Sequence, residues 1–136
     1  MIRRLFVAAV VLAVSAVGAS AQPKIQTGTM KKTSPGDAKA MFANYCASCH
    51  GLDAKGTGPA APALKKVPAD LTKISARNGG TFPEVKVKRY IEGLDEVAAH
   101  GSRDMPMWGR LFKELDRDTA IIRVQGLSDY LKGLQQ

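Results

Sequence analysis

The sequence predicts an all-α domain, and three observations lead to this prediction. Apolar residues recur at steps of three and four in several separate segments, as they do along the buried face of a helix. No segment shows the sustained alternation of apolar and polar residues that is typical of a half-buried strand. The chain has 136 residues, a length that allows one domain. We therefore expect one helical domain, covering residues 34–136, preceded by segments that do not belong to it.

The amino-terminal residues 1–21 have the pattern of a cleavable secretory signal peptide. Arg3 and Arg4 precede an apolar run from Leu5 to Val17, and Ala19-Ser20-Ala21 is a small-residue cleavage site. The run has 13 residues, whereas a helix that spans a bilayer needs about 20. An uncleaved membrane anchor is the alternative. We expect cleavage after this site, export to the periplasm and no stable membrane insertion of the mature chain.

The first predicted helix follows a polar leader, residues 22–33, which we expect to be flexible. Ser34-Pro35-Gly36-Asp37 is a helix start, with Ser as the N-cap and Pro in the first turn. One face of this helix is apolar and consists of Ala38, Met41, Phe42, Tyr45 and Cys46.

Three more helices are predicted downstream. A short one begins after Asp70 and ends at Gly79-Gly80, and the next begins at Pro83. The longest covers residues 116–134, with Gly126 inside it as a candidate point of close helix contact. The apolar faces of the last two helices are Val87, Tyr90, Ile91 and Leu94, and Ile121, Val124, Leu127, Leu131 and Leu134. Residues 51–68 and 101–109 are predicted loops because they are rich in Gly and Pro.

The chemistry of the chain is concentrated in Cys46-Ala47-Ser48-Cys49-His50, which contains both cysteines of the sequence. C-x-x-C-H is the signature of covalent attachment of a c-type haem. Positions three apart lie about one turn apart on the same side of a helix, so two thiols can reach the two vinyl groups of one porphyrin. The next residue, His50, can then present its imidazole to the iron. Export supports this reading independently, because bacteria attach c-type haem outside the cytoplasmic membrane. We predict one haem c, bound through Cys46 and Cys49.

Three other uses of the cysteines compete with this prediction. A thioredoxin-like redox pair would accompany a βαβ pattern, which the sequence lacks. A zinc site would need two further good ligands, and the sequence offers only His100 and carboxylates. A structural disulfide is the third alternative.

A haem iron ligated by His50 needs a sixth ligand or has an open position. The candidates are His100, Met30, Met41, Met105 and Met107. Met41 lies on the apolar face of the first predicted helix, so we expect it in the core. Met105 belongs to Met105-Pro106-Met107-Trp108-Gly109, a predicted loop that Pro106 stiffens and that can carry a thioether to the iron. The alternative is that Met105 and Met107 fill gaps around Trp108.

These motifs resemble those of the small bacterial class I c-type cytochromes, which hold one haem. The matching pieces are residues 46–51, Gly56-Thr57-Gly58-Pro59 and residues 105–109. The resemblance implies a cytochrome c fold, with three to five helices wrapped around one covalently attached haem. It also implies that the first and last helices cross, with Phe42 against residues 127–131 and Gly126 at the close approach.

The resemblance also implies roles for individual site residues. His50 is the proximal iron ligand and Met105 is the distal one. The carbonyl of Pro59, or alternatively that of Pro62, accepts the imidazole N–H and thereby orients the ring. Two departures from the pattern keep alternatives open: Met107 offers a second thioether, and His100 would permit ligation by two histidines.

The predicted function is electron transfer rather than catalysis, because two protein ligands leave the iron no open position. We expect a monomeric periplasmic one-electron carrier. The alternatives are a haem c subunit of a periplasmic or membrane-bound oxidoreductase complex and a gas-binding or sensing haem protein. Trp108 would pack on the haem or donate its indole N–H to a propionate, or it would be an ordinary core residue.

The charge of the chain predicts acidic redox partners. The formal net charge is +8, and the signal peptide accounts for two of these charges. Six lysines lie near the predicted loops: Lys55, Lys65, Lys66, Lys73, Lys86 and Lys88. They form either a basic docking face for these partners or a scattered solvated surface. Arg77, Asn78 and Arg89 are candidate partners of the haem propionates. We expect no binding of nucleic acid by an exported protein.

Overall fold

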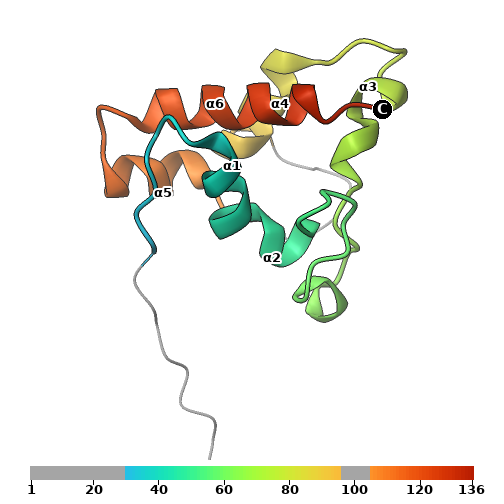
Figure 1. Ribbon diagram of the computed structural model, residues 1–136, viewed down its shortest axis with the longest axis horizontal. Coiled ribbons are helices and arrows are strands. Elements are labelled where there is room, and N and C mark those ends of the chain that lie inside the picture. The colour runs from blue at the N-terminus through green and yellow to red at the C-terminus, as the bar shows by residue number, and fades with distance from the viewer. Residues whose placement is uncertain (1–29, 96–104) are drawn as a thin grey trace, which may run out of the picture. The chain divides into compact units, whose positions relative to one another are not determined.

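The structure, a computed structural model, describes residues 30–95 and 105–136. Every regular element within these residues is a helix, which confirms the all-α class (Figure 1). In chain order the elements are α1 (Ala38–Met41), the π-helical η2 (Phe42–Cys46), α2 (Ala47–His50), the 3₁₀-helical η3 (Ala61–Ala63) and η4 (Leu71–Lys73), α3 (Ile74–Arg77), α4 (Glu84–Glu92), α5 (Trp108–Leu115) and α6 (Ala120–Gly133). No helix among the described residues is long and apolar enough to cross a membrane.

The first predicted helix is present, but it begins later and contains a wide turn. Asp37, rather than Ser34, is its N-cap, and the Asp37 side chain accepts a hydrogen bond of 2.8 Å from the Ala40 N–H. In η2 the backbone widens, and the Ala47 N–H bonds to the carbonyl of Phe42, five residues back. Single π turns inside α-helices are frequent at functional sites. Here the π turn leads directly into the Cys46–His50 segment.

Helix α6 lies at the centre of the packing and contacts α1, α4 and α5 (Figure 1). The predicted contact between the first and last helices is confirmed, since the ring centroids of Phe42 and Tyr130 lie 5.4 Å apart. The largest fully buried apolar side chains are Phe42, Phe112, Met41 and Leu127. Met41 is therefore a core residue, as predicted.

Three details of the predicted helices are wrong. Ile121 is 75% exposed, although Val124, Leu127 and Leu131 of the same predicted face are buried. Ala120 and Arg123 occupy the first turn of the buried face in its place. Leu94 is 60% exposed, because Gly93 adopts the left-handed conformation and ends α4 before it. Helix α5 is missing from the prediction: it begins inside the predicted loop 101–109 and continues through residues 110–115, although Trp108, Leu111, Phe112 and Leu115 have helical spacing.

Gly126 faces the first helix, as predicted, but the contact does not require a glycine. A Cβ added at this position would lie 3.6 Å from Met41 Cε and 3.7 Å from Ala38 Cβ. These are ordinary van der Waals separations, so an alanine would fit.

The end of the polar leader is tied to the helices by two side chains. The Tyr45 hydroxyl lies 2.7 Å from the Lys31 carbonyl oxygen and 2.7 Å from Thr33 Oγ1. The Arg123 guanidinium is buried and donates to the Thr33 carbonyl over 2.9 Å. A buried cation is costly unless its N–H groups are hydrogen-bonded, and Thr33 supplies two acceptors for this one, its carbonyl and its hydroxyl. The predicted signal peptide and most of the leader lie outside the described residues.

Candidate haem-attachment site

The five residues of the C-x-x-C-H motif lie on one continuous stretch of helix. Cys46 ends the π turn, and Ala47–His50 form α2. Both cysteines are free thiols, and both are half-buried, as is His50. The helix ends at Gly51, whose φ of 77° favours glycine. Two thiols and one imidazole are thus presented together at the end of a helix.

The His50 imidazole is oriented by a backbone carbonyl that the sequence did not reveal. His50 Nδ1 lies 3.1 Å from the carbonyl oxygen of Ala69. The prediction that Pro59, or its rival Pro62, supplies this carbonyl is therefore wrong. A protonated Nδ1 donates to Ala69 and leaves Nε2 free as a ligand for a metal.

The reason for this difference is that residues 56–60 bind the helix end instead. The N–H groups of Gly56, Gly58 and Ala60 donate to the carbonyls of His50, Cys49 and Ser48, over 2.7 to 3.1 Å. These bonds satisfy the last carbonyls of α2, which have no partner inside the helix. The chain then turns through η3 and returns along His50, where the Leu71 N–H donates to the Ala54 carbonyl over 2.7 Å. Ala69 lies on this returning segment.

Two glycines allow the backbone segments to approach so closely. A Cβ at Gly58 would overlap the carbonyl oxygens of Ser48 and Ala47, and one at Gly56 would overlap the Pro68 carbonyl. Gly56 also has a φ of 83°, which L side chains rarely adopt. The Gly-x-Gly pattern of residues 56–58 is therefore a requirement of the fold around His50.

We expect Gly58→Ala to lower the free energy of unfolding by about 2–4 kcal/mol, because the new methyl group would overlap backbone atoms that cannot move aside. Chemical denaturation measures this change. Gly133→Ala is the matched control, since a Cβ there has nothing within 4 Å. Equal stability of the two variants would contradict the close approach described here.

The two methionines of the 105–109 segment lie in different surroundings. Met107 packs against Gly93, where an added Cβ would lie 2.7 Å from Met107 Cγ. Met107 also lines a shallow groove with Arg110, Leu111 and Glu114 on α5. The Met105 side chain is 38% exposed and lines no part of that groove. His100, the other candidate ligand, lies outside the described residues.

Trp108, the first residue of α5, belongs to an aromatic cluster. Its ring centroid lies 5.6 Å from that of Tyr45 and 5.7 Å from that of Phe112. Tyr45 immediately precedes Cys46, so the cluster joins the motif to the start of α5. Trp108 therefore packs against Tyr45 and Phe112, and its predicted contact with the haem or a propionate stays a prediction.

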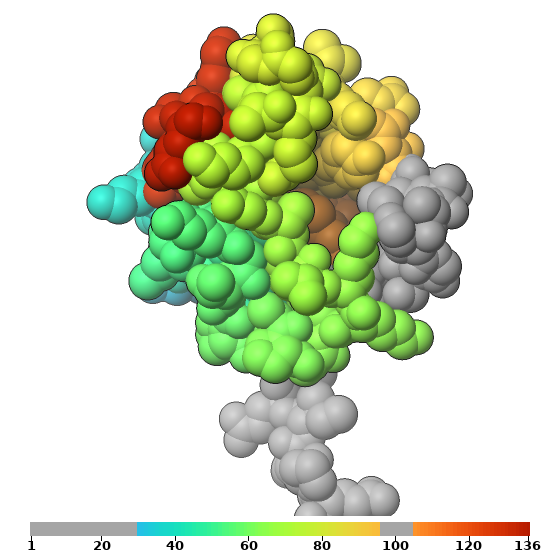
Figure 2. Space-filling view, turned by 90° about the vertical axis from the view of Figure 1, so that its right-hand side faces the viewer, coloured from blue at the N-terminus to red at the C-terminus, as the bar shows by residue number. Residues whose placement is uncertain are grey.

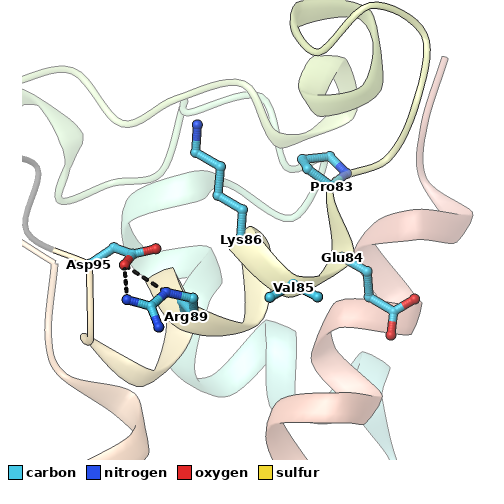
Figure 3. Close-up of a pocket in the computed structure, with 6 residues that line it drawn as sticks. All are labelled: Pro83, Glu84, Val85, Lys86, Arg89 and Asp95. Atoms are coloured by element: carbon cyan, nitrogen blue, oxygen red, sulfur yellow. Dashed lines mark hydrogen bonds and ion pairs between the residues drawn. The ribbon is translucent and has the colours of Figure 1, made fainter.

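The three candidate partners of the propionates all have partners within the chain. Arg77 donates to the Asp70 carbonyl over 2.6 Å, and Asn78 donates to the Thr81 carbonyl over 2.9 Å. Arg89 forms an ion pair with Asp95, with 2.6 Å between Nη2 and Oδ1 (Figure 3). Each of the three thus has a partner within the chain but keeps further N–H groups, so their role as propionate partners stays a prediction.

The comparisons with known proteins identify the family. Residues 34–121, more than half of the chain, match the family model described as cytochrome C oxidase, cbb3-type, subunit III. The chain belongs to this family of monohaem c-type cytochromes. Comparisons with curated proteins and with solved structures give no match.

The residues of this cytochrome fit a haem c. The motif supplies two free thiols and an imidazole whose Nδ1 is already held. Figure 2 shows a hollow in the surface between the green loop residues and the yellow α4. Orange atoms of the α5 segment lie inside this hollow. Cys46, Cys49 and His50 are the residues that would hold the group, and Met105 stays the predicted sixth ligand.

The surroundings of the thiols argue against the other uses of the cysteines in this cytochrome. Burial raises the pKa of the Cys46 thiol to about 12, and the neighbouring Cys49 adds to the rise. Reactive redox cysteines have lowered pKa values instead. Among the described residues, no group of three or more His, Cys, Asp or Glu could hold a metal ion.

The lowered pKa of His50 also favours the binding of a metal by its imidazole. Burial lowers the pKa of His50 below its ordinary value, and the hydrogen bond to the Ala69 carbonyl opposes this shift. The neutral imidazole is the form that ligates iron.

Proposed function

We propose that this cytochrome is a periplasmic one-electron carrier that holds one haem c. In this proposal Cys46 and Cys49 form the two thioether bonds, and His50 and Met105 ligate the iron. The observation that carries it is the helical stretch from Cys46 to His50, with both thiols free and the imidazole oriented by Ala69. When bound, the haem supplies one-electron exchange between ferrous and ferric iron.

The residues around the site have three tasks in this function. The Ala69 carbonyl accepts a hydrogen bond from the Nδ1–H of His50 and thereby makes Nε2 more basic. Met105 supplies a neutral thioether, which favours the ferrous state and raises the reduction potential relative to a second imidazole. The aromatic cluster of Tyr45, Trp108 and Phe112 keeps water from one side of the motif. Saturated ligation and exclusion of water favour electron exchange over bond chemistry.

The periplasmic location rests on the signal-peptide pattern of residues 1–21 and on the chemistry of haem attachment. A second candidate function is that of a haem c subunit within an oxidase complex, which the description of the matching family favours. A free carrier would purify alone as a monomer, whereas a subunit would co-purify with its complex in fixed stoichiometry.

A redox-titrated absorption spectrum of the purified periplasmic protein tests the proposal. We expect a low-spin ferric spectrum with the far-red band of methionine–iron ligation, and a single one-electron transition. A high-spin spectrum with rapid binding of carbon monoxide would overturn it in favour of a gas-binding protein.

We also propose a basic docking face for acidic redox partners. Lys55, Lys65, Lys66, Lys73 and Lys86 are exposed, whereas Lys88 is half-buried and bonds to Glu84 and Gln125 over 3.0 Å each. Lys88 is therefore excluded from the face.

Raising the salt concentration is expected to slow electron transfer with the physiological partner. Between about 0.01 M and 0.15 M ionic strength the Debye length falls from about 30 Å to about 8 Å, so we expect about a tenfold fall in the second-order rate. Stopped-flow kinetics measures this. A rate independent of salt would rule out the docking face.

A further inference from the structure

Four consecutive backbone carbonyls, beginning with the one that contacts His50, each accept a hydrogen bond from a different residue. Residues 69–72 form the segment that returns along the motif and enters η4. The hydrogen bonds join Ala69 O to His50 Nδ1 (3.1 Å), Asp70 O to Arg77 Nη2 (2.6 Å), Leu71 O to Gln135 Nε2 (2.9 Å) and Thr72 O to the Gln136 N–H (3.1 Å). Two of the four donors therefore belong to the last two residues of the sequence.

The Gln135 side chain makes three hydrogen bonds, which together join residues 71–75 to α6. Its Nε2 donates to the Leu71 carbonyl over 2.9 Å and to the Leu131 carbonyl in the last turns of α6 over 2.7 Å. Its Oε1 accepts from the Ser75 N–H over 2.8 Å. Figure 1 shows the carboxyl terminus lying beside α3. One half-buried amide thus ties the end of the longest helix to residues 71–75, about 60 residues earlier.

The position of the Ala69 carbonyl depends on these hydrogen bonds, because the side chain of Ala69 does little to fix it. Its side chain is a methyl group and the residue is exposed. Leu71, two residues later, is held at both backbone groups: its N–H donates to Ala54 and its carbonyl accepts from Gln135. Ala69 and the extended N-cap residue Asp70 lead directly into Leu71, the first residue of η4, so a shift at Leu71 moves the Ala69 oxygen.

We propose that Gln135 is a positioning residue for the proximal histidine: by fixing Leu71 it keeps the Ala69 carbonyl in hydrogen-bond contact with His50 Nδ1. This inference rests on the proposed function, since it concerns the histidine that binds the haem iron. The carboxyl terminus therefore tunes the basicity of an iron ligand that it does not touch.

Gln135→Met tests the proposal, because methionine has a similar length but makes none of the three hydrogen bonds. We expect the His50 Nδ1 proton of the reduced, diamagnetic protein to exchange with solvent about five to ten times faster, the factor that the loss of one hydrogen bond brings. We also expect a more positive reduction potential, because a weaker Nδ1–H···O bond makes the imidazole a poorer donor to ferric iron. The far-red methionine–iron band should persist.

Two further variants sharpen the test. Gln136→Ala is the matched control, because Gln136 contributes its backbone N–H, which this change keeps. It should leave the His50 exchange rate and the potential unchanged. Gln135→Glu keeps the acceptor for the Ser75 N–H and loses both donors, so we expect the same faster exchange of the His50 proton. This variant serves for the exchange measurement if the methionine variant does not fold, whereas its added charge shifts the potential by itself.

The possible results separate this inference from the proposed function. If the unsubstituted protein lacks a low-spin spectrum, the proposed function fails and the inference fails with it. If that spectrum is present and the Gln135 variants lose thermal stability while the His50 exchange rate and the potential stay constant, Gln135 is a structural residue only and this inference alone is overturned.

Discussion

Replacement of both cysteines, Cys46→Ala with Cys49→Ala, is expected to leave the exported protein without covalently bound haem. Each thioether bond needs one of these two sulfurs, and the chain contains no other cysteine. Haem staining after denaturing electrophoresis and the intact mass of the purified protein both measure the loss. Ser48→Ala, at the exposed position between the cysteines, is the matched control and should keep its haem. Covalent haem in the double variant would contradict the attachment site.

The same double variant should also be much less stable, because the core buries little apolar area without the haem. The buried hydrophobic residues of the described structure include three alanines, Ala47, Ala54 and Ala120. Alanine contributes little apolar area, and a tightly bound ligand stabilises the native state in proportion to its affinity. We expect the melting temperature to fall by about 10–20 °C, the shift that a loss of several kcal/mol causes in a domain of this size. An unchanged melting temperature would mean that the helices pack without the haem.

Met105→Ala is expected to abolish the far-red band of methionine–iron ligation and to lower the reduction potential. The lost thioether favours the ferrous state, and its replacement by water or another ligand removes that preference. We expect a fall of about 0.1–0.3 V, within the ~0.8 V range over which axial ligands set haem potentials. Absorption spectroscopy combined with a redox titration measures both changes.

Met107→Ala is the paired variant that decides between the two sulfurs. Met107 packs against Gly93 at the end of α4, so its loss should reduce stability but preserve the far-red band. If only Met107→Ala removes the band, the sixth ligand is Met107 and the assignment to Met105 is wrong. If neither change removes it, the ligand comes from elsewhere, and His100 becomes the first residue to replace.

Helices with a regular apolar face could be predicted well, but not their last residues. Val87 and Ile91 of α4 are buried as their spacing predicts, whereas Gly93 ends the helix before Leu94. Helix α5 was missed because Pro106 and Gly109 made its beginning look like a loop. Most of the buried face of α6 was predicted correctly, since Val124, Leu127 and Leu131 are buried, but its first turn was not. Ile121 is more apolar than Arg123, yet the structure buries the arginine with a hydrogen bond to Thr33 and exposes the isoleucine.

The chemistry of this cytochrome can be read from five adjacent residues. Cys46, Cys49 and His50 are close in space because they are close in the chain, and a helical turn brings them together whatever the rest of the protein does. The carbonyl that orients His50 could not be predicted in this way, because every residue has a carbonyl and no side-chain pattern marks the one from Ala69. Its place follows from contacts across long sequence separations, among them those of Gln135, and only the folded chain brings such groups within the short reach of a hydrogen bond.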